Sequence, residues 1–551
     1  MSSTLRYLPL GGLGEVGRNM WLLEWDRQVL VIDSGLMFPT EEQPGIDLVI
    51  PDISYLRDPS RKVLGIVLTH AHEDHIGALP FVLKSLNVPV YGTRLTLGLV
   101  RPKLKEHHIL READLREFRS GDTVQLGPFK VRSIAVNHSI PDAVALAIRT
   151  PVGTVAYTGD FKLDPNPLDG EPTDMRKFQA LGNEGVLLLL SDSTNAERSG
   201  RCGSERELTE PFEAIFKAAV GRIVVATFAS NIPRIQHIVS LAEEHGRSIA
   251  IAGRSLQNNT KIAQELGFLK VKAGTIVKLE NANGVPDAKL VLLCAGSQGE
   301  PLSALSRFAS LKHPLVNVRK GDTVLISATP IPGNERLVSR TINHLYKHGA
   351  DVHYSQIGKV HVSGHAYGGE LRDMIDAVRP RFFIPVHGEY RQLTHHARIA
   401  REAGISDDRI LMIEDGQSVN LTKDSMAKGE VFQAGMVFVD GMGVGDVEHV
   451  VLRDRNRLAE DGIVVVTIAV DRTTGEVKAG PDLVSMGFIE PDLNDELMAE
   501  AAQAIRENVR KMPPGDSEIS VLKEAIHEGV SRVLFRRTKR RPMIIPVITE
   551  L

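Results

Sequence analysis

The residues best suited to chemistry in this sequence lie in the segment THAHEDHIGALP, directly after the apolar run VLGIVL. His70, His72, Asp74 and His75 form the pattern H-x-H-x-D-H. If these residues form an irregular loop before a helix that begins near Ile76, alternate side chains can turn toward one point. Imidazole and carboxylate are ligands that suit zinc or manganese. The pattern therefore predicts a metal site, and the alternative is a solvated loop in which Asp74 caps a helix.

Three further candidate ligands each end a short apolar run that is predicted to be a strand. VRSIAVNH ends on His138, GTVAYTGD on Asp160 and RFFIPVH on His387. One loop cannot supply every ligand of two ions, so the others are expected at strand ends in the same sheet. Each of these residues alone is more often an ordinary surface-loop residue. Together with the H-x-H-x-D-H segment, they support one another.

The elements that must position these residues follow three patterns along the chain. Up to about residue 205, short apolar runs with hairpin-length gaps predict sheets with antiparallel pairs. From about 205 to 355, strands alternate with helical patterns, which predicts a parallel sheet with crossover helices. The end of the chain has the pattern of a separate small α+β domain.

GLGEVG, residues 12–17, matches a dinucleotide-binding fingerprint, but a strand pattern follows it, so we interpret it as a tight turn.

Composition narrows the class of protein. With 551 residues and 42% hydrophobic residues, the chain predicts several folded domains. The net charge of −4 does not indicate a nucleic-acid partner, so an anionic ligand would need a local basic surface. Two cysteines, Cys202 and Cys294, can form neither a disulfide framework nor a cysteine zinc site. No apolar run is long enough for a membrane helix and no export signal is recognisable. These features predict a soluble cytoplasmic protein without a membrane partner.

These residues and motifs resemble the metallo-β-lactamase superfamily. The resemblance implies an αβ/βα sandwich with two divalent metal ions, Zn2+ or Mn2+, along one edge of its sheets. The implied ligands are His70, His72 and His138 for one ion, Asp74, His75 and His387 for the other, and Asp160 as a bridge. Asp33 in VIDSG matches the family's acid that orients a liganding histidine.

The segment between Asp160 and His387 narrows the resemblance to the β-CASP nucleases, in which a cap domain interrupts the lactamase fold. Asp192 in LLLLSDSTN and His365 in HVSGHA match that group's additional motifs. GGLGEVGRNM, ATFASNIPR, GSQGEP, PIPGNE and PVHGEYRQL resemble the bacterial ribonuclease J family across nearly the whole chain. The resemblance implies 5′-to-3′ exonuclease and endonuclease activity in RNA maturation and decay, including rRNA processing and mRNA decay.

The candidate catalytic residues are Asp74, Asp160, Asp192 and His365. Two ions can lower the pKa of a bridging water and stabilise charge on a phosphate, which provides a hydroxide nucleophile. Asp160 suits a bridging position because a carboxylate has two oxygens. His365 could protonate the leaving 3′ oxygen or clamp the phosphate, with Asp192 orienting it. The alternatives are a polar loop histidine and a helix N-cap, respectively.

Two loops of small and polar residues are candidate RNA-binding segments. Their backbone amides can approach phosphate oxygens, and in ribonuclease J the matching segments are associated with a 5′-monophosphate pocket and the scissile region. The predicted substrate-binding residues are Phe228, Ser230, Asn231, His361, Val362, Ser363, Gly364 and His365. Ordinary turn chemistry is the alternative for any one of them. The basic segments 101–108 and 536–541 are further candidates, although such runs are often solvated faces.

The resulting hypothesis is a two-metal ribonuclease that acts on RNA, preferably 5′-monophosphorylated. The resemblance also implies a homodimer, with a homotetramer as the alternative, and partners in an RNA decay complex. The predicted domains are a lactamase domain at 1–205 and 356–445, a β-CASP domain at 206–355, a linker at 446–462 and a C-terminal domain at 463–551. The alternatives are a small-molecule hydrolase on the same fold, a DNA-directed β-CASP nuclease, and a non-catalytic RNA-binding subunit.

Overall fold

The computed structural model describes residues 4–168, 170, 172–331, 333–447, 449–471, 476–512 and 519–551. Two compact units are present. The first comprises the chain up to Phe38 together with Val49–Val437, and the second comprises Pro39–Leu48 together with Phe438–Leu551. The second unit resumes at Phe438, and the domain boundary expected between residues 445 and 446 stays a prediction.

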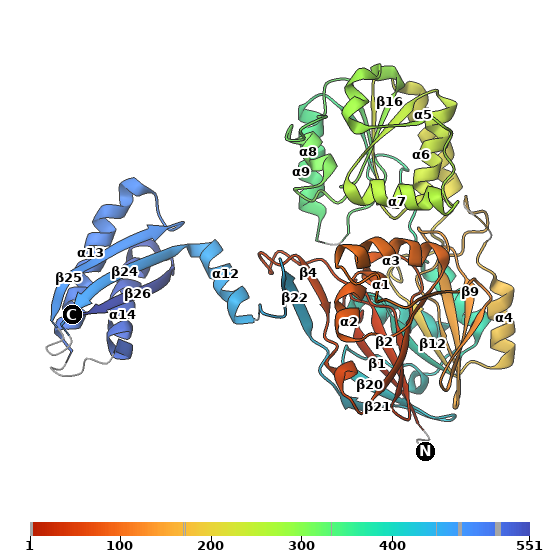
Figure 1. Cartoon of the computed structure of the whole chain (residues 1–551), viewed down its shortest axis with the longest axis horizontal. Coiled ribbons are helices and arrows are strands. Elements are labelled where there is room, and N and C mark those ends of the chain that lie inside the picture. Colours follow the sequence, from red (N-terminus) through yellow and green to blue (C-terminus); the bar gives the residue numbers. More distant parts are fainter. Residues whose placement is uncertain are drawn as a thin grey trace. The chain divides into compact units, whose positions relative to one another are not determined.

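The first unit contains a domain of two sheets packed face to face, which we call the two-sheet domain (Figure 1). The order of the first sheet is β21-β20-β1-β2-β3-β5-β6-β7. Its strands are β1 (Leu5–Gly11), β2 (Met20–Trp25), β3 (Gln28–Ile32), β5 (Lys62–Val67), β6 (Val90–Gly92), β7 (Leu115–Glu117), β20 (Gln417–Leu421) and β21 (Met426–Val431). The order of the second sheet is β19-β12-β11-β10-β9-β8. Its strands are β8 (Thr123–Leu126), β9 (Phe129–Ala135), β10 (Val144–Thr150), β11 (Gly153–Tyr157), β12 (Leu188–Asp192) and β19 (Phe382–Val386).

Alternating apolar residues from both sheets form the core between them, where Trp21 of the first sheet meets Tyr157 of the second edge to face, with ring centroids 4.2 Å apart. A second core covers the outer face of the second sheet. Its helices are α4 (Met175–Glu184), α10 (Gly368–Val378) and α11 (Tyr390–Glu402). The helices between β5 and β7 are α1 (Glu73–Ile76), α2 (Leu79–Ser85) and α3 (Arg94–Glu106). The expected αβ/βα sandwich is thereby confirmed.

A second domain is inserted between β12 and β19, and we call it the inserted domain. Its six strands are all parallel, in the order β15-β14-β16-β13-β17-β18. They are β13 (Ile223–Ala226), β14 (Ser248–Ala252), β15 (Ile276–Val277), β16 (Leu290–Cys294), β17 (Thr323–Ile326) and β18 (Asp351–His353). One face packs on α5 (Thr209–Ala218), α6 (Ile232–Glu244) and α7 (Arg254–Glu265). The other face packs on α8 (Ala304–Ala309) and α9 (Glu335–Lys347), so the predicted crossover architecture is confirmed.

After the insertion the chain completes both sheets of the two-sheet domain. β19 pairs in parallel with β12, and β20 pairs antiparallel with β1. The sequence on the two sides of the insertion therefore forms one domain, as the resemblance implies.

The second unit contains a three-stranded sheet with a helical layer on one face. The sheet order is β25-β24-β26, and α13 and α14 share a core with it. Its elements are α12 (His449–Asp461), β24 (Ile463–Val470), β25 (Val477–Met486), α13 (Pro491–Arg510), α14 (Ile519–Thr538) and β26 (Met543–Glu550). Short strands elsewhere are β4 (Leu48–Pro51), β22 (Met436–Asp440) and β23 (Gly443–Val444).

Residues 446–462, predicted to be a linker, are largely helical because α12 occupies most of them, while Glu448 lies outside the described residues. Of the α12 side chains only Leu452 is buried, which explains why its apolar pattern is weak. Among the described residues, no helix combines the length and apolar character needed to span a membrane.

Candidate metal centre

Sheet topology brings the candidate ligands to one edge. β10 runs antiparallel to both β9 and β11, while β11, β12 and β19 are mutually parallel. The C-terminal ends of β9, β11, β12 and β19 therefore lie at the same edge of the second sheet. His138, Asp160 and His387 follow three of these ends, and Asp192 is the last residue of β12.

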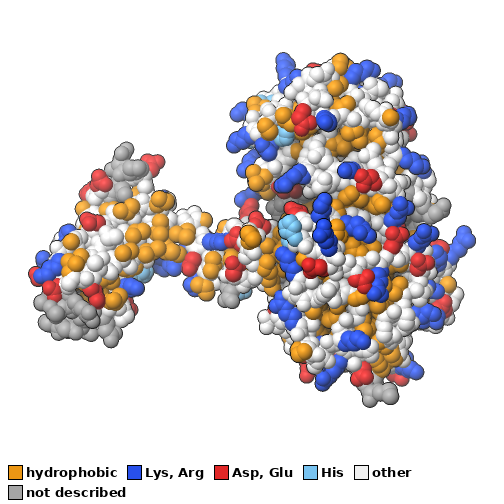
Figure 2. All heavy atoms as spheres, viewed as in Figure 1, with side chains coloured by type: hydrophobic (Ala, Val, Ile, Leu, Met, Phe, Trp, Pro, Cys, Tyr) orange, Lys and Arg blue, Asp and Glu red, His pale blue; other side chains and the backbone are white. Residues whose placement is uncertain are grey.

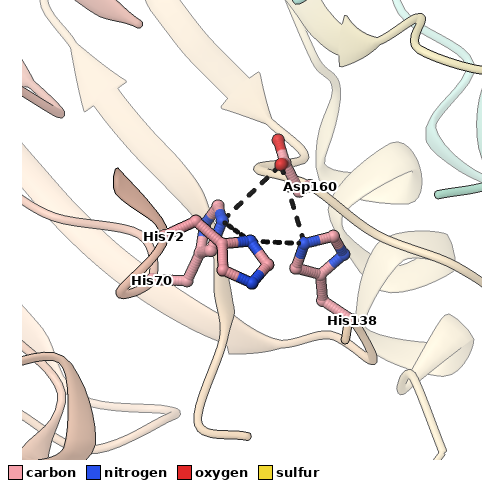
Figure 3. A group of neighbouring side chains, drawn as sticks. All are labelled: His70, His72, His138 and Asp160. Atoms are coloured by element: carbon pink, nitrogen blue, oxygen red, sulfur yellow. Dashed lines mark hydrogen bonds and ion pairs between the residues drawn. The ribbon is translucent and has the colours of Figure 1, made fainter. Parts of the chain in front are cut away.

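The first group of side chains is His70, His72, His138 and Asp160, whose ligand atoms lie within 4.8 Å of one another (Figure 3). His72 Nδ1 lies 3.1 Å from His70 Nε2 and 3.0 Å from His138 Nε2. Asp160 Oδ2 lies 3.5 Å from His70 Nε2 and 3.7 Å from His138 Nε2. Three imidazole nitrogens and one carboxylate oxygen therefore face a common point.

The second group is Asp74, His75, Asp160 and His387. His75 Nε2 lies 3.3 Å from Asp160 Oδ2 and 3.6 Å from Asp74 Oδ2. His387 Nε2 lies 3.3 Å from Asp74 Oδ2, and its Nδ1 lies 3.1 Å from Asp160 Oδ1. Asp160 belongs to both groups, so the structure brings all seven predicted ligands together around one carboxylate.

Asp160 fits a metal-bridging position by its own environment. Its side chain is 1% exposed, and among the described residues neither of its oxygens accepts a hydrogen bond of good geometry. A buried carboxylate without such partners is costly unless a cation compensates it. Imidazole and carboxylate are the nitrogen and oxygen donors that zinc and manganese accept. The residues present therefore fit two divalent cations that share Asp160.

Groups outside the ligand sets fix the orientation of several histidines. The buried Asp33 accepts a hydrogen bond from His75 Nδ1 at 2.8 Å and another from the backbone N–H of Thr69 at 2.8 Å. His138 Nδ1 donates to the carbonyl oxygen of Gly364 at 2.7 Å. Each bond occupies Nδ1 and leaves Nε2 facing the centre, which is the usual arrangement for a liganding histidine. The expected orienting role of Asp33 agrees with this geometry.

The electrostatics differ between the two groups. Burial lowers the pKa of His70 and His138 well below its usual range, and neighbouring imidazoles add to this effect. Burial opposes charge on His75 as well, but the carboxylates of Asp160, Asp74 and Asp33 outweigh it and raise the His75 pKa to about 10. The first group therefore holds neutral imidazoles, which are the liganding form. The second group favours positive charge, which a divalent cation would supply.

His365 and Asp192 lie together at the rim of the centre. His365 Nδ1 is 2.8 Å from Asp192 Oδ2, and the His365 side chain is 21% exposed, whereas that of Asp192 is 1% exposed. Burial opposes charge on His365, but Asp192 raises its pKa. Asp192 Oδ1 also accepts hydrogen bonds from the backbone and hydroxyl of Thr194, so the N-cap-like turn expected as an alternative coexists with the orienting contact.

The predicted RNA-binding residues occupy two loops with different surroundings. In the first loop, Phe228 and Ser230 are half-buried, while the buried Asn231 caps α6 by accepting a hydrogen bond from the Arg234 backbone N–H. In the second loop, Ser363 Oγ accepts hydrogen bonds from Asn195 Nδ2 at 2.8 Å and from the backbone N–H of His365 at 3.1 Å.

The remaining residues of the second loop offer less side-chain surface. Val362 packs in the core of the inserted domain. Burial lowers the pKa of His361 to about 3, and its Nδ1 has no hydrogen-bond partner among the described residues. A Cβ on Gly364 would lie 2.8 Å from Ser139 Oγ, so this position needs glycine to let its carbonyl reach His138. Arg234 links the two loops, because it donates to Ser327, whose hydroxyl donates to the carbonyl of Val360.

Local backbone structure at the centre departs from the expected irregular loop. Glu73–Ile76 form the short helix α1 before α2 begins at Leu79, so the predicted helix start near Ile76 was late by three residues. The two acids at its start favour a helix N-terminus, which explains the early start. His387 has a φ of 54° and Asp33 a φ of 59°, in the left-handed region that non-glycine residues rarely adopt. Strain of this kind concentrates at functional sites.

Two contacts of the centre were missed in the sequence. Asn19 Nδ2 lies 3.0 Å from the Asp74 carbonyl oxygen and 3.2 Å from His75 Nε2. Thr194 Oγ1 lies 3.1 Å from His387 Nδ1. Both residues belong to motifs that were used only for the resemblance, GGLGEVGRNM and LLLLSDSTN. Thr194 lies two residues after the candidate Asp192, which is a weak local signal, whereas Asn19 is next to no candidate residue in the sequence.

Four family models match the chain. Residues 13–197 match the metallo-β-lactamase superfamily, and residues 220–345 match the β-CASP domain of ribonuclease J. Residues 349–408 match the RNA specificity domain of Zn-dependent metallo-hydrolases, and residues 450–551 match the C-terminal domain of ribonuclease J.

Curated relatives match over the full length. The chain is 40% identical to ribonuclease J2 of Bacillus subtilis, covering 100% of this chain and 99% of the relative. It is 42% identical to ribonuclease J of Thermus thermophilus, covering 98% of this chain and 95% of the relative. Among solved structures, a protein of unknown function from Enterococcus faecalis has a TM-score of 0.52 at 15% identity, covering 76% of this chain and 100% of that one, which indicates a shared fold only.

Proposed function

The chain belongs to the ribonuclease J family, and from this premise we propose that it is a metal-dependent ribonuclease with 5′-to-3′ exonuclease and endonuclease activity. The single observation that supports the proposal most is the convergence of seven side chains, separated by up to 317 residues in sequence, on the buried carboxylate of Asp160. Side chains so distant in sequence have no structural reason to expose this many donor atoms to one point unless a cation binds there.

We propose that two divalent ions occupy the centre, held by the side chains that the two groups contain. The ligands are His70, His72 and His138 for one ion, Asp74, His75 and His387 for the other, and Asp160 for both. When bound, such ions supply Lewis acidity, which lowers the pKa of a water and stabilises charge on a phosphate. The donor set is compatible with zinc and with manganese.

His365 is the proposed general acid for the leaving 3′ oxygen. It has the exposure and the position for this role, because it lies at the rim beside Asp160, with Nδ1 4.0 Å from Asp160 Oδ2. Its Nδ1 donates to Asp192, so Nε2 is the atom that can transfer a proton to substrate. Asp192 stabilises the protonated imidazole and fixes its orientation.

The 5′ end of RNA is the proposed occupant of the loops around Ser230 and Ser363. Both loops offer backbone N–H groups and hydroxyls, which bind phosphate oxygens. Val362 can contribute only its backbone, because its side chain is buried in the core. We propose a preference for a 5′-monophosphate at this position.

The test is incubation of purified protein with 3′-labelled RNA in the presence of manganese or zinc. RNA with a 5′-monophosphate should be degraded from the 5′ end, and matched RNAs with a 5′-hydroxyl or 5′-triphosphate should be degraded more slowly. A chelator-treated sample is the control. Intact RNA under all metal conditions would contradict the proposal, and equal degradation of DNA of the same sequence would favour a DNA-directed nuclease instead.

A homodimer that uses the second unit is a further part of the proposal. The sheet face opposite α13 and α14 exposes apolar side chains on β25 and β26, namely Val484, Met486, Ile545 and Val547. Light scattering of the full chain should give the mass of a dimer or tetramer. The family membership also supports a cytoplasmic location and partners in RNA decay.

A further inference from the structure

Two neighbouring segments of the inserted domain are strongly basic, although the chain as a whole has a net charge of −4. Residues 304–320 and 335–348 together contain seven Lys or Arg residues and a single acid, Glu335. These segments include α8 and α9, which cover the same face of the parallel sheet. Ser306 Oγ and Thr341 Oγ1 lie 3.3 Å apart, so the two helices are in direct contact.

The cations of α9 lie on the side of the helix that faces away from the protein core. Val338, Ile342 and Leu345 are buried in the core beneath α9. Arg336, Arg340 and Lys347 are exposed, and their spacing of four and seven residues places them on one helical face opposite that apolar stripe. Arg336 and Arg340 are about 6 Å apart along the helix axis, which is close to the separation of successive phosphates in an extended single strand, and Lys347 lies about 10 Å beyond Arg340.

These cations have no acidic partners within the described part of the chain. Among the described residues, Arg336, Arg340 and Lys347 form no ion pair, whereas Arg319 of the first segment pairs with Asp287. The carboxylate of Glu335 accepts a hydrogen bond from the backbone N–H of Gly333 at 2.9 Å. Other exposed arginines, such as Arg372 on α10, do pair with an acid. Positive charge is therefore left uncompensated on this face.

A shallow hollow in the surface lies over the same helix, lined by Arg336, Ser339, Arg340, Asn343 and His344 as well as Glu335. Figure 2 shows Lys and Arg side chains along the left edge of the inserted domain, where Figure 1 places α8 and α9. Amide and hydroxyl groups beside guanidinium groups are a typical phosphate-binding composition.

We infer that the α8–α9 face is a second binding surface for the sugar-phosphate backbone of single-stranded RNA, separate from the candidate metal centre. The inference rests on the proposed ribonuclease function. None of its residues belongs to the predicted ligand, catalytic or loop residues, so it would contribute affinity for long substrates without taking part in the chemistry. The α8–α9 face offers positive charge and only a shallow surface. It should therefore bind RNA without sequence preference, and its affinity should depend strongly on salt concentration.

The test compares the wild type with the double variant Arg336→Gln/Arg340→Gln, using 5′-monophosphorylated pentanucleotides and RNAs many times longer. The variant should raise KM severalfold for the long RNA, with kcat unchanged, and should leave both parameters unchanged for the pentanucleotide. In anisotropy measurements with long 5′-hydroxyl RNA, the slope of log affinity against log salt should fall by about 0.7 for each phosphate contact that is lost.

The matched control is Arg176→Gln/Lys177→Gln on α4, which removes the same number of exposed charges from a helix where Lys177 already faces Asp174 at 3.6 Å. This control should behave as wild type. If the α9 variant leaves the dependence on RNA length and salt unchanged, or if the control has the same effect, the inference is wrong. If the wild type cleaves no RNA of any length, the proposed function fails, and the anisotropy result still decides the α8–α9 surface independently.

Discussion

Removal of the His365 imidazole should separate proton transfer from metal binding. His365 lies within ligand distance of Asp160, Asp192 and His387, so geometry alone permits a third liganding group there. We assign it to proton transfer because its Nδ1 is engaged with Asp192 at 2.8 Å and its side chain is 21% exposed, whereas the side chains of His138 and His387 are at most 1% exposed.

The expected loss in His365→Ala follows from that assignment. A positioned general acid contributes about 10² to 10⁴ in rate, which corresponds to about 2.7 to 5.4 kcal/mol in the activation free energy. The loss of activity should appear in the rate constant of cleavage measured under single-turnover conditions. Metal content per chain, measured by elemental analysis after dialysis, should equal that of the wild type, because His365 belongs to neither proposed ligand set. Asp192→Asn should have a smaller effect on kcat, since the amide can still orient the ring but cannot stabilise its charge.

A substrate with sulfur in place of the leaving 3′ oxygen provides the decisive comparison. A thiolate is a good leaving group without protonation, so this substrate should restore most of the lost rate in His365→Ala. It should restore little in Asp160→Asn, where the defect lies in the metal centre. Loss of one ion per chain in His365→Ala, or no recovery with the sulfur substrate, would refute the assignment of His365 as the acid.

Other perturbations test the centre and its surroundings. Asp160→Asn should lower bound metal per chain and abolish RNA cleavage, because both proposed ion sites share this carboxylate; retention of two ions would contradict the bridging role. Asp33→Asn should weaken metal affinity by about 10 to 100-fold in chelator competition, since His75 loses its orienting partner, and an unchanged affinity would count against it. Burial and Glu15 raise the pKa of Asp415 to about 7 despite Arg18. The native state therefore holds this proton to higher pH than the unfolded chain, and stability should fall as the pH rises from about 4 to about 7; thermal melts of Asp415→Asn should lack that decline, and an identical pH profile would show that another group is responsible.

The proposed ligands could be predicted because three of them each end an apolar run, and the other four lie in one segment directly after another apolar run. The predicted strands before His138, Asp160 and His387 are all present, and each residue lies within three positions of the strand end. An apolar run that ends on a histidine or an aspartate is informative, because a polar side chain at the end of a buried strand needs a partner that compensates its loss of hydration. The inserted parallel sheet was predictable for a related reason, since its strands are short continuous apolar runs between helical patterns.

The contacts of Asn19 and Thr194 were not predictable by the same argument. Each is a small polar residue in a loop, and many such residues cap or turn the backbone without touching a functional group. Asn19 reaches the centre only because Gly35 allows the backbone of Asp74 to approach closely; a Cβ on Gly35 would lie 1.6 Å from the Asp74 carbonyl oxygen. A fit of this kind depends on tertiary packing rather than on local sequence.

The register of one strand pair explains how the inserted domain and the centre depend on each other. β12 and β19 are neighbours in the second sheet, and Asp192 pairs with Val386, the residue before His387. The whole inserted domain lies in the connection between these two strands, and His365 lies on the path of its return. Two neighbouring parallel strands need a crossover connection between them. An inserted domain can therefore occupy this connection without disturbing the backbone pairing that places Asp192 beside His387. The pairing of β12 with β19 also fixes Asp192, which contacts His365. A shift of β19 by one residue would turn His387 away from Asp160 and from Asp192. The centre would then lose a proposed ligand, and the Asp192–His365 pair would lose its neighbour His387.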